Sequence, residues 1–388
     1  MRIYCDYNAT SPVTPEVAEA VARATRDVFG NASSVHHFGQ QAKSALDEAR
    51  AAVAALIGGD PSDVVFTSGG TESDNLAIRG VAGSLEGPDG AGRRRLMASA
   101  IEHEAVLNTL KSLARRGWQT MAVPVDHTGV VSPDRVRDLM TSDTALVSIM
   151  HANNEIGTIQ PIGALAAIAH EQGALLHTDA VQSAGKIPID VRALDVDLVS
   201  LSAHKFNGPK GVGALWVKRG TRMQPAQTGG KQERGRRAGT ENVPAIVGMG
   251  VAARLAAAKI AAEGSRLGGL RDRLERAVLE RVPGTTVNGG ESPRVPNTTN
   301  ISFDRIEAES LLIALDLDGV AVSTGSACSS GTLEPSHVLR AMGLPTPRAQ
   351  NSLRFSLGLF STDDEVDRVI AVLPGLVERL RRLTRRAG

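Results

Sequence analysis

The segment Asp197-Leu-Val-Ser-Leu-Ser-Ala-His-Lys-Phe-Asn-Gly-Pro-Lys-Gly211 carries the strongest structural signal in this chain of 388 residues. It opens with a β-type run over residues 197–200 and then changes into a turn rich in glycine and proline. Three other short apolar runs, residues 145–149, 174–177 and 213–217, alternate with helical stretches. This alternation predicts an α/β fold in which helices flank a mostly parallel central sheet.

A long helix is predicted in the second half of the chain. Residues 245–282 form an Ala-rich, helical pattern, and Pro283-Gly284 ends it. The chain is long enough for about two to three domains. We therefore expect this helix to join a large domain, residues 13–255, to a smaller α+β domain. The smaller domain is expected to contain residues 256–388 together with residues 1–12.

Lys205 is the first candidate for chemistry, because it stands where the β-type run gives way to the turn. Partial removal from water lowers the pKa of a lysine and makes its amine nucleophilic. Such an amine forms a Schiff base with a carbonyl cofactor, of which pyridoxal 5'-phosphate (PLP) is the usual one. An ordinary exposed lysine is the commoner alternative. Support for a catalytic role has to come from other segments.

The segment His177-Thr-Asp-Ala-Val-Gln-Ser183 offers a carboxylate at the end of an apolar run. Asp179 could pair with the protonated pyridine nitrogen of PLP, which makes the ring an electron sink. Gln182 could donate a hydrogen bond to the phenolic oxygen of the same ring. The alternative is that Asp179 caps the next helix, and for an isolated Asp this is the commoner use.

The segment Val64-Val-Phe-Thr-Ser-Gly-Gly-Thr-Glu-Ser-Asp-Asn75 has the pattern of a strand, a glycine turn and a helix start. Backbone N–H groups and the helix dipole make such a start an anion site. Gly69 and Gly70 allow close approach of a phosphate, and Thr71 adds a hydroxyl. The spacing of a Walker A loop is absent. A simple βα connection explains the pattern about as well.

The chain has two cysteines, Cys5 and Cys328. Cys328 lies among small polar residues in Ser323-Thr-Gly-Ser-Ala-Cys-Ser-Ser-Gly-Thr332, a composition typical of a mobile, solvent-accessible loop. We expect it to be a reactive thiol. Cys5 is expected to be a small core or strand residue. Two cysteines without CxxC spacing predict neither a disulfide framework nor a metal site.

Composition and charge are ordinary for a soluble globular protein. The hydrophobic fraction is 42%, the charged fraction 22% and the net charge +1, so global electrostatics give no support for binding nucleic acid. No apolar run reaches the length of about 18 residues that a membrane span needs. We expect no membrane partner and a cytoplasmic location.

Taken together, these motifs resemble the PLP-dependent cysteine desulfurases of the nitrogen-fixation and iron–sulfur-assembly type, in the class V aminotransferase family. The resemblance runs nearly from end to end. The matching words are Tyr4-Cys-Asp-Tyr-Asn-Ala-Thr10, Thr67-Ser-Gly-Gly-Thr-Glu-Ser-Asp-Asn75, Ile101-Glu-His103, His151-Ala-Asn-Asn-Glu-Ile-Gly157, Ser202-Ala-His-Lys205, Gly235-Arg-Arg-Ala-Gly-Thr-Glu-Asn242, Gly325-Ser-Ala-Cys-Ser-Ser-Gly-Thr-Leu-Glu-Pro-Ser336 and Leu353-Arg-Phe-Ser-Leu-Gly358. It implies PLP-dependent transferase fold type I and a homodimer.

The resemblance also implies a role for each candidate residue. Lys205 would hold PLP and later move the Cα proton of the substrate, while His103 would stack on the ring and serve in proton transfer. The remaining cofactor and substrate contacts would come from Gly70, Thr71, Ser202 and His204 at the phosphate, Asp179 at the pyridine nitrogen, Gln182 and Asn154 near the phenolic oxygen and the substrate, Arg354 at the substrate carboxylate, and Thr240 of the neighbouring subunit.

The implied reaction takes sulfur from L-cysteine, releases L-alanine and leaves a persulfide on Cys328. A sulfur-acceptor protein, such as an iron–sulfur scaffold, would then receive the sulfur. The alternatives are another PLP activity, such as a selenocysteine lyase or a transaminase, and a non-catalytic partner protein that keeps the fold. A transaminase has no need of Cys328, and a non-catalytic protein predicts no PLP absorption, or a bound-cofactor signal that substrate does not change.

Overall fold

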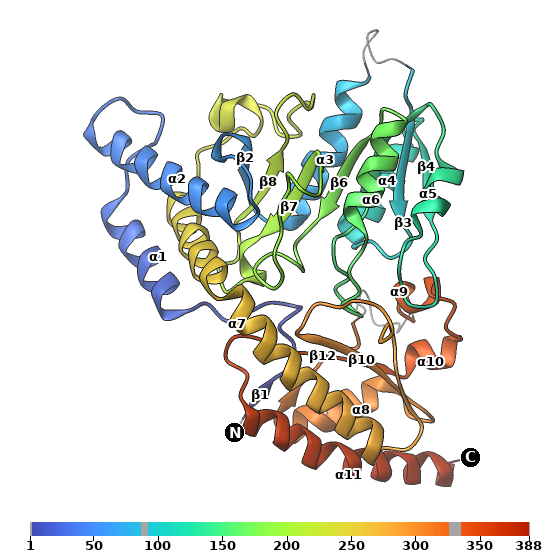
Figure 1. Ribbon diagram of the computed structural model, residues 1–388. Helices are drawn as coiled ribbons and strands as arrows, with labels where there is room; N and C mark the ends of the chain where they lie inside the picture. Colours follow the sequence, from blue (N-terminus) through green and yellow to red (C-terminus); the bar gives the residue numbers. More distant parts are fainter. Residues whose placement is uncertain (1, 87–91, 326–334, 388) are drawn as a thin grey trace.

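The computed structural model describes residues 2–86, 92–325 and 335–387. Its centre is a seven-stranded sheet with the order β2-β8-β7-β6-β5-β3-β4 (Figure 1). These strands are β2 (Val64–Thr67), β3 (Arg95–Ser99), β4 (Gln119–Val123), β5 (Thr144–Ser148), β6 (Leu175–Asp179), β7 (Leu198–Ser202) and β8 (Gly213–Val217). Strand β8 runs antiparallel to both of its neighbours, and the other pairs are parallel. The predicted mostly parallel α/β sheet is confirmed.

Helices cover both faces of this sheet because its strands are apolar on both sides. Alternate strand residues show this: Met97 packs into one core, and its neighbours Leu96 and Ala98 pack into the other. The first face carries α1 (Pro15–Asp27), α2 (His37–Leu56), α5 (Pro133–Leu139), α6 (Ile162–Glu171) and the first half of α7 (Val243–Arg281), and the second carries α3 (Gly70–Ser84) and α4 (Glu104–Ala114).

A second, smaller sheet has the antiparallel order β12-β10-β9. Its strands are β9 (Thr285–Val287), β10 (Thr298–Phe303) and β12 (Ser352–Ser356), beside the parallel pair β1 (Ile3–Tyr4) and β11 (Val320–Ala321). Helices α8 (Ala308–Leu317) and α11 (Asp363–Ala387) share its core. Helices α9 (His337–Ala341) and α10 (Thr346–Gln350) pack in a separate small core that includes Ile101 and Met150. The short helical turns are η1 (Pro61–Asp63), η2 (Ala203–Lys205) and η3 (Gln232–Gly235).

Helix α7 passes through both cores, which confirms the predicted long helix. Its first half contributes Ile246 and Met249 to the core under the large sheet, and its second half contributes Leu270 and Leu274 to the core of the small sheet. By length and composition alone α7 could cross a membrane. It packs against α1, α2 and α11, however, as a core helix of a soluble protein does.

A buried ion pair fixes the turn that precedes α7. Arg50 on α2 forms two hydrogen bonds with the carboxylate of Glu233, each 2.7 Å long. Arg50 also donates to the carbonyl of Val64 at 2.7 Å, and its guanidinium lies 4.6 Å from the ring centre of Phe66. Glu233 has a φ of +46°, a left-handed conformation that a non-glycine residue rarely adopts. The ion pair therefore helps to hold an otherwise unfavourable turn.

We predict that Arg50→Met lowers the free energy of unfolding by about 3–5 kcal/mol, because it leaves the carboxylate of Glu233 buried without its partner. The denaturation midpoint in urea measures the effect. Arg26→Met is the matched control, since the Arg26–Asp27 pair lies on the surface, and its midpoint should equal that of the wild type. An unchanged midpoint for Arg50→Met would show that the pair does not stabilise the fold.

Candidate active site

A cavity of about 600 Å³ lies at the ends of β6 and β7, and Arg354 of β12 is part of its lining. It brings together most of the residues predicted from the sequence. These are Gly70, Thr71, His103, Asn154, Asp179, Gln182, Ser202, His204, Lys205 and Arg354. Residues on both sides of the predicted thiol, Ser323, Gly325, Pro335 and Ser336, also line the cavity. Cys328 itself lies outside the described residues.

Thr240 does not line this cavity. It lies in a separate hollow of about 180 Å³, next to Phe66, Thr67 and Ser68. The second cysteine, Cys5, lies within the described residues and is buried after β1, and burial raises the pKa of its thiol to about 12. Cys5 is therefore the core residue that the sequence predicts.

Lys205 presents an amine to the cavity at the end of η2, directly after β7. Its Nζ donates hydrogen bonds to the carbonyl oxygens of Asn8 at 2.5 Å and Ala9 at 2.9 Å. Burial and the positive charge of Arg354 lower the pKa of Lys205 to about 8. A substantial fraction of the amine is therefore neutral and nucleophilic close to neutral pH.

A second buried lysine, Lys186, was not predicted from the sequence. Its Nζ donates to Asn8 Oδ1 at 3.0 Å and to Gln182 Oε1 at 2.8 Å. Burial, followed by the charge of Lys205, lowers its pKa well below the usual range. Lys186 lines only a smaller cavity of about 70 Å³, whereas Lys205 lines both cavities. The amine that faces the large cavity is therefore that of Lys205.

Asp179 ends β6 and turns a carboxylate into the cavity. Its Oδ1 accepts the N–H of Val181 at 2.8 Å. The helix required by the capping alternative is absent, since residues 181–186 form turns. Burial raises the pKa of Asp179. Gln182 lies beside it, with Nε2 donating to the carbonyl of Asn8 at 2.9 Å.

Further buried carboxyl groups surround Asp179, and sequence reasoning missed them. Asp74 on α3 lines the cavity, and burial together with the charge of Asp179 raises its pKa well above the usual value. Burial also raises the pKa of Glu102, to about 8. His177, with its Nε2 3.7 Å from Asp74 Oδ1, has a pKa lowered to about 3 by burial. A cationic aromatic nitrogen in this region would meet carboxyl groups and a neutral imidazole.

The start of α3 has the features of an anion site. The N-cap, Gly69, makes no side-chain hydrogen bond to the first turn of this helix. A Cβ at Gly70 would lie 2.9 Å from Val181 Cγ2, so only glycine fits there without displacement. His204 also lines the cavity; its Nδ1 is 3.0 Å from Thr10 Oγ1, and burial lowers its pKa to about 4. The helix start offers N–H groups at the cavity wall.

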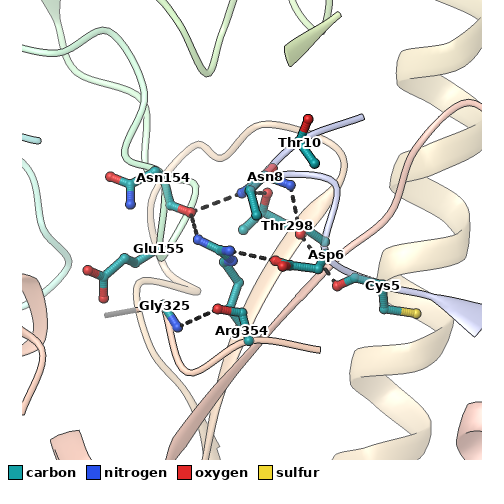
Figure 2. A network of polar contacts seen from close by, with 12 residues as sticks. Cys5, Asp6, Asn8, Thr10, Asn154, Glu155, Thr298, Gly325 and Arg354 are labelled. Carbon is teal, nitrogen blue, oxygen red and sulfur yellow. Dashed lines mark hydrogen bonds and ion pairs between the residues drawn. The ribbon is translucent and has the colours of Figure 1, made fainter. Parts of the chain in front are cut away.

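Arg354 on β12 supplies a buried cation to the cavity, and Figure 2 shows its contacts with Asp6 and Asn154. Its Nη2 is 2.6 Å from Asp6 Oδ1, and its Nη1 donates to the carbonyl of Asn154 at 2.9 Å. Its Nε is buried without a hydrogen-bond partner in the structure. A guanidinium fixed in this way can bind a carboxylate in a defined orientation.

His103 forms the N-cap of α4 at the mouth of the cavity. Its Nδ1 accepts the N–H of Ala105 at 3.1 Å. Because Nδ1 is the acceptor, the neutral ring carries its proton on Nε2. His103 therefore has a defined tautomer, which allows it to exchange a proton at one atom, Nε2.

We predict that Lys205 in the cofactor-free protein reacts with added PLP at a rate that rises with pH and levels off above about pH 8. The neutral amine is the reactive form, and an unperturbed lysine would give a midpoint near 10.4. Arg354→Met should move the midpoint upward, because it removes a nearby positive charge. Arg137→Met, on the exposed face of α5, should not. Absorbance of the adduct measures the rate, and a wild-type midpoint near 10 would contradict the assignment.

Comparison with known proteins places this geometry in a family. The model of the family described as aminotransferase class-V matches residues 3–369 of this chain. A protein from Dictyoglomus turgidum, cysteine desulfurase IscS, is 48% identical over 382 residues, which cover 98% of this chain and 96% of that protein. A cysteine desulfurase from Gluconacetobacter diazotrophicus is 49% identical over 384 residues, covering 98% of this chain and 95% of that protein.

Solved structures show a similarity of the same extent. A NifS-like protein superposes with a TM-score of 0.90 at 38% identity and covers 98% of this chain and 100% of its own. A second structure, SspA in complex with cysteine, has a TM-score of 0.82 at 34% identity. The match covers 93% of this chain and 100% of that one. Because the similarity extends over almost the whole length, the chain belongs to the class-V aminotransferase family and, within it, to the cysteine desulfurases.

Proposed function

We propose that this protein uses PLP bound at Lys205 to take sulfur from L-cysteine, which releases L-alanine and leaves a persulfide on Cys328. One observation carries the proposal. A single cavity gathers a lysine with a lowered pKa, a buried carboxylate, an uncapped helix start and a fixed guanidinium. Each of these groups suits a different part of PLP or of an amino-acid substrate.

The residues present fit PLP, on which the class-V aminotransferase family depends. Lys205 would hold its aldehyde carbon, Asp179 its pyridine nitrogen, and Gln182 and Asn154 would lie near its phenolic oxygen. Gly70 at the uncapped start of α3 supports a phosphate there. The phosphate contacts are assigned to Gly70, Thr71, Ser202 and His204, with Thr240 supplied by a second copy of the chain. When bound, PLP supplies an acceptor for the electron pair that the Cα–H bond releases.

Other residues of the cavity lining would bind and orient the substrate. Arg354 would hold the carboxylate of L-cysteine, and Asn154, whose backbone carbonyl accepts from Arg354, also lines the cavity. The solved relative SspA binds cysteine, which supports the same substrate here. Lys205 would move the Cα proton. His103, with its Nε2–H directed by the bond at Nδ1, would give or take a proton at the substrate.

The sulfur step forms one bond and breaks one bond. The Cys328 thiolate attacks the substrate sulfur, the new sulfur–sulfur bond forms, and the Cβ–S bond breaks with its electron pair passing to the carbon skeleton. Proton uptake at that carbon completes L-alanine. The sum is L-cysteine and a thiol giving L-alanine and a persulfide, with no external oxidant or reductant. An acceptor protein, such as an iron–sulfur scaffold, would then remove the sulfur.

The proposal includes a homodimer and a cytoplasmic location. Thr240 lies away from the cavity of its own chain, so a second copy has to supply the threonine that the family places at the phosphate. The division into a large domain of residues 13–255 and a small domain of 256–388 with 1–12 is part of the proposal. The separate cores on the two halves of α7 support it.

We predict that Cys328→Ala binds PLP like the wild type but releases almost no alanine or sulfide from L-cysteine, because the attacking thiolate is missing. Measurement of alanine and sulfide from purified protein with PLP and a thiol reductant checks this. Equal turnover in the variant would point to a transaminase or another PLP reaction. Turnover of selenocysteine alone would point to a selenocysteine lyase, and absence of PLP absorption in the wild type to a non-catalytic protein.

A further inference from the structure

Glu155 lies in a rigid turn beside the cavity and has no role in the proposed chemistry. Asn153 Oδ1 accepts the N–H groups of Glu155 at 2.8 Å and of Ile156 at 3.1 Å. Gly157, with a φ of +79°, closes the turn by donating to the carbonyl of Asn153 at 3.0 Å. Glu155 is buried, with 2% of its surface exposed. The position of its carboxylate is therefore well defined.

The carboxylate of Glu155 lies next to the chain on both sides of residues 326–334. On one side, Ser336 Oγ donates to Oε2 at 2.5 Å, and the same hydroxyl accepts the N–H of Leu339 at 3.2 Å as the N-cap of α9. On the other side, Gly325 is so close that a Cβ there would lie 3.0 Å from the same Oε2. The carboxylate of Glu155 thus bonds to Ser336 after the segment and lies close to Gly325 just before it.

The neighbouring residue, Asn154, connects this contact to Arg354. Its carbonyl accepts from Arg354 Nη1 at 2.9 Å. The backbones of Arg354 and Ser323 exchange two hydrogen bonds, of 2.7 Å and 3.3 Å, just before Gly325. Figure 2 shows Asn154, Glu155, Gly325 and Arg354 close to one another, and all four line the cavity. Hydrogen bonds thus connect Arg354 both to the residue before Glu155 and to Ser323, two residues before Gly325.

We propose that Glu155 is a positioning residue that holds both ends of the segment carrying Cys328 in a fixed place relative to Arg354. This inference rests on the proposed function, in which Cys328 attacks the sulfur of a substrate held by Arg354. The rate of an intramolecular attack depends strongly on how the two reacting groups are held. If both ends of the segment are held relative to Arg354, the thiol of Cys328 has fewer positions to sample before the sulfur–sulfur bond forms.

The test compares two signals in a single turnover of the holoenzyme with L-cysteine. The absorbance change of bound PLP reports the reaction at the ring, and peptide mass spectrometry after rapid quenching reports persulfide on Cys328. Glu155→Ala should slow persulfide formation by about tenfold to hundredfold. It should leave the absorbance change at the wild-type rate. Glu155→Gln keeps an oxygen that accepts from Ser336 and should retain most of the persulfide rate.

A third signal needs no cofactor. Free iodoacetamide requires no positioning, so it should alkylate Cys328 of the cofactor-free protein at the same rate in every variant. Cys5 does not interfere, because it is buried and burial raises its pKa to about 12. A changed alkylation rate would show that the thiol itself is altered, and it would overturn the positioning role.

Two serine variants complete the design. Ser336→Ala removes one contact of Glu155 and should also slow persulfide formation, so the inference can be tested even if Glu155→Ala does not fold. Ser132→Ala removes the matched N-cap hydroxyl of α5, which does not line the cavity, and should change neither rate. Wild-type persulfide formation in Ser336→Ala and Glu155→Ala, or equal loss of both signals, would overturn the inference. A wild type without persulfide on Cys328 would contradict the proposed function itself.

Discussion

The hydrogen bonds of Asn8 hold the two sheets together where both reach the cavity. Its side-chain amide donates to the carbonyl of Asn154 at 3.0 Å and to Thr298 Oγ1, on the small sheet, at 2.8 Å. Its backbone carbonyl accepts from Gln182 at 2.9 Å and from Lys205 at 2.5 Å. Partners from four separate segments of the chain therefore meet at one residue. The amine of Lys205 acquires its place and its burial only when the N-terminal segment is docked.

Burial then sets the ionisation of the site. It lowers the pKa of Lys205 and of His204, and it raises the pKa of Asp179 and of Glu102. All four shifts favour the neutral form, as low polarity does for isolated groups. The guanidinium of Arg354 forms an ion pair with the carboxylate of Asp6. A charged cofactor or substrate in such a cavity interacts strongly with the few fixed charges that are present.

Local sequence patterns predicted what is local in the structure. The alternating apolar runs predicted strands of the central sheet. Lys205 and Asp179 could be predicted as site residues because each lies at or just after the end of a strand, and these two strands end at the same edge of the sheet. The antiparallel direction of β8 was not predicted, because no pattern within a strand records its direction. Asn8 and Lys186 were missed for a related reason. They meet the site through tertiary contacts between residues 178 positions apart, which spacing alone does not reveal.

The central claim is that Lys205, rather than its buried neighbour Lys186, carries the cofactor. Reduction of the PLP-loaded protein with borohydride makes the link to the lysine permanent, and peptide mass spectrometry then locates the pyridoxyl group. The account predicts the group on Lys205, whose amine lines the large cavity. A pyridoxyl group on Lys186, or on neither residue, would contradict it.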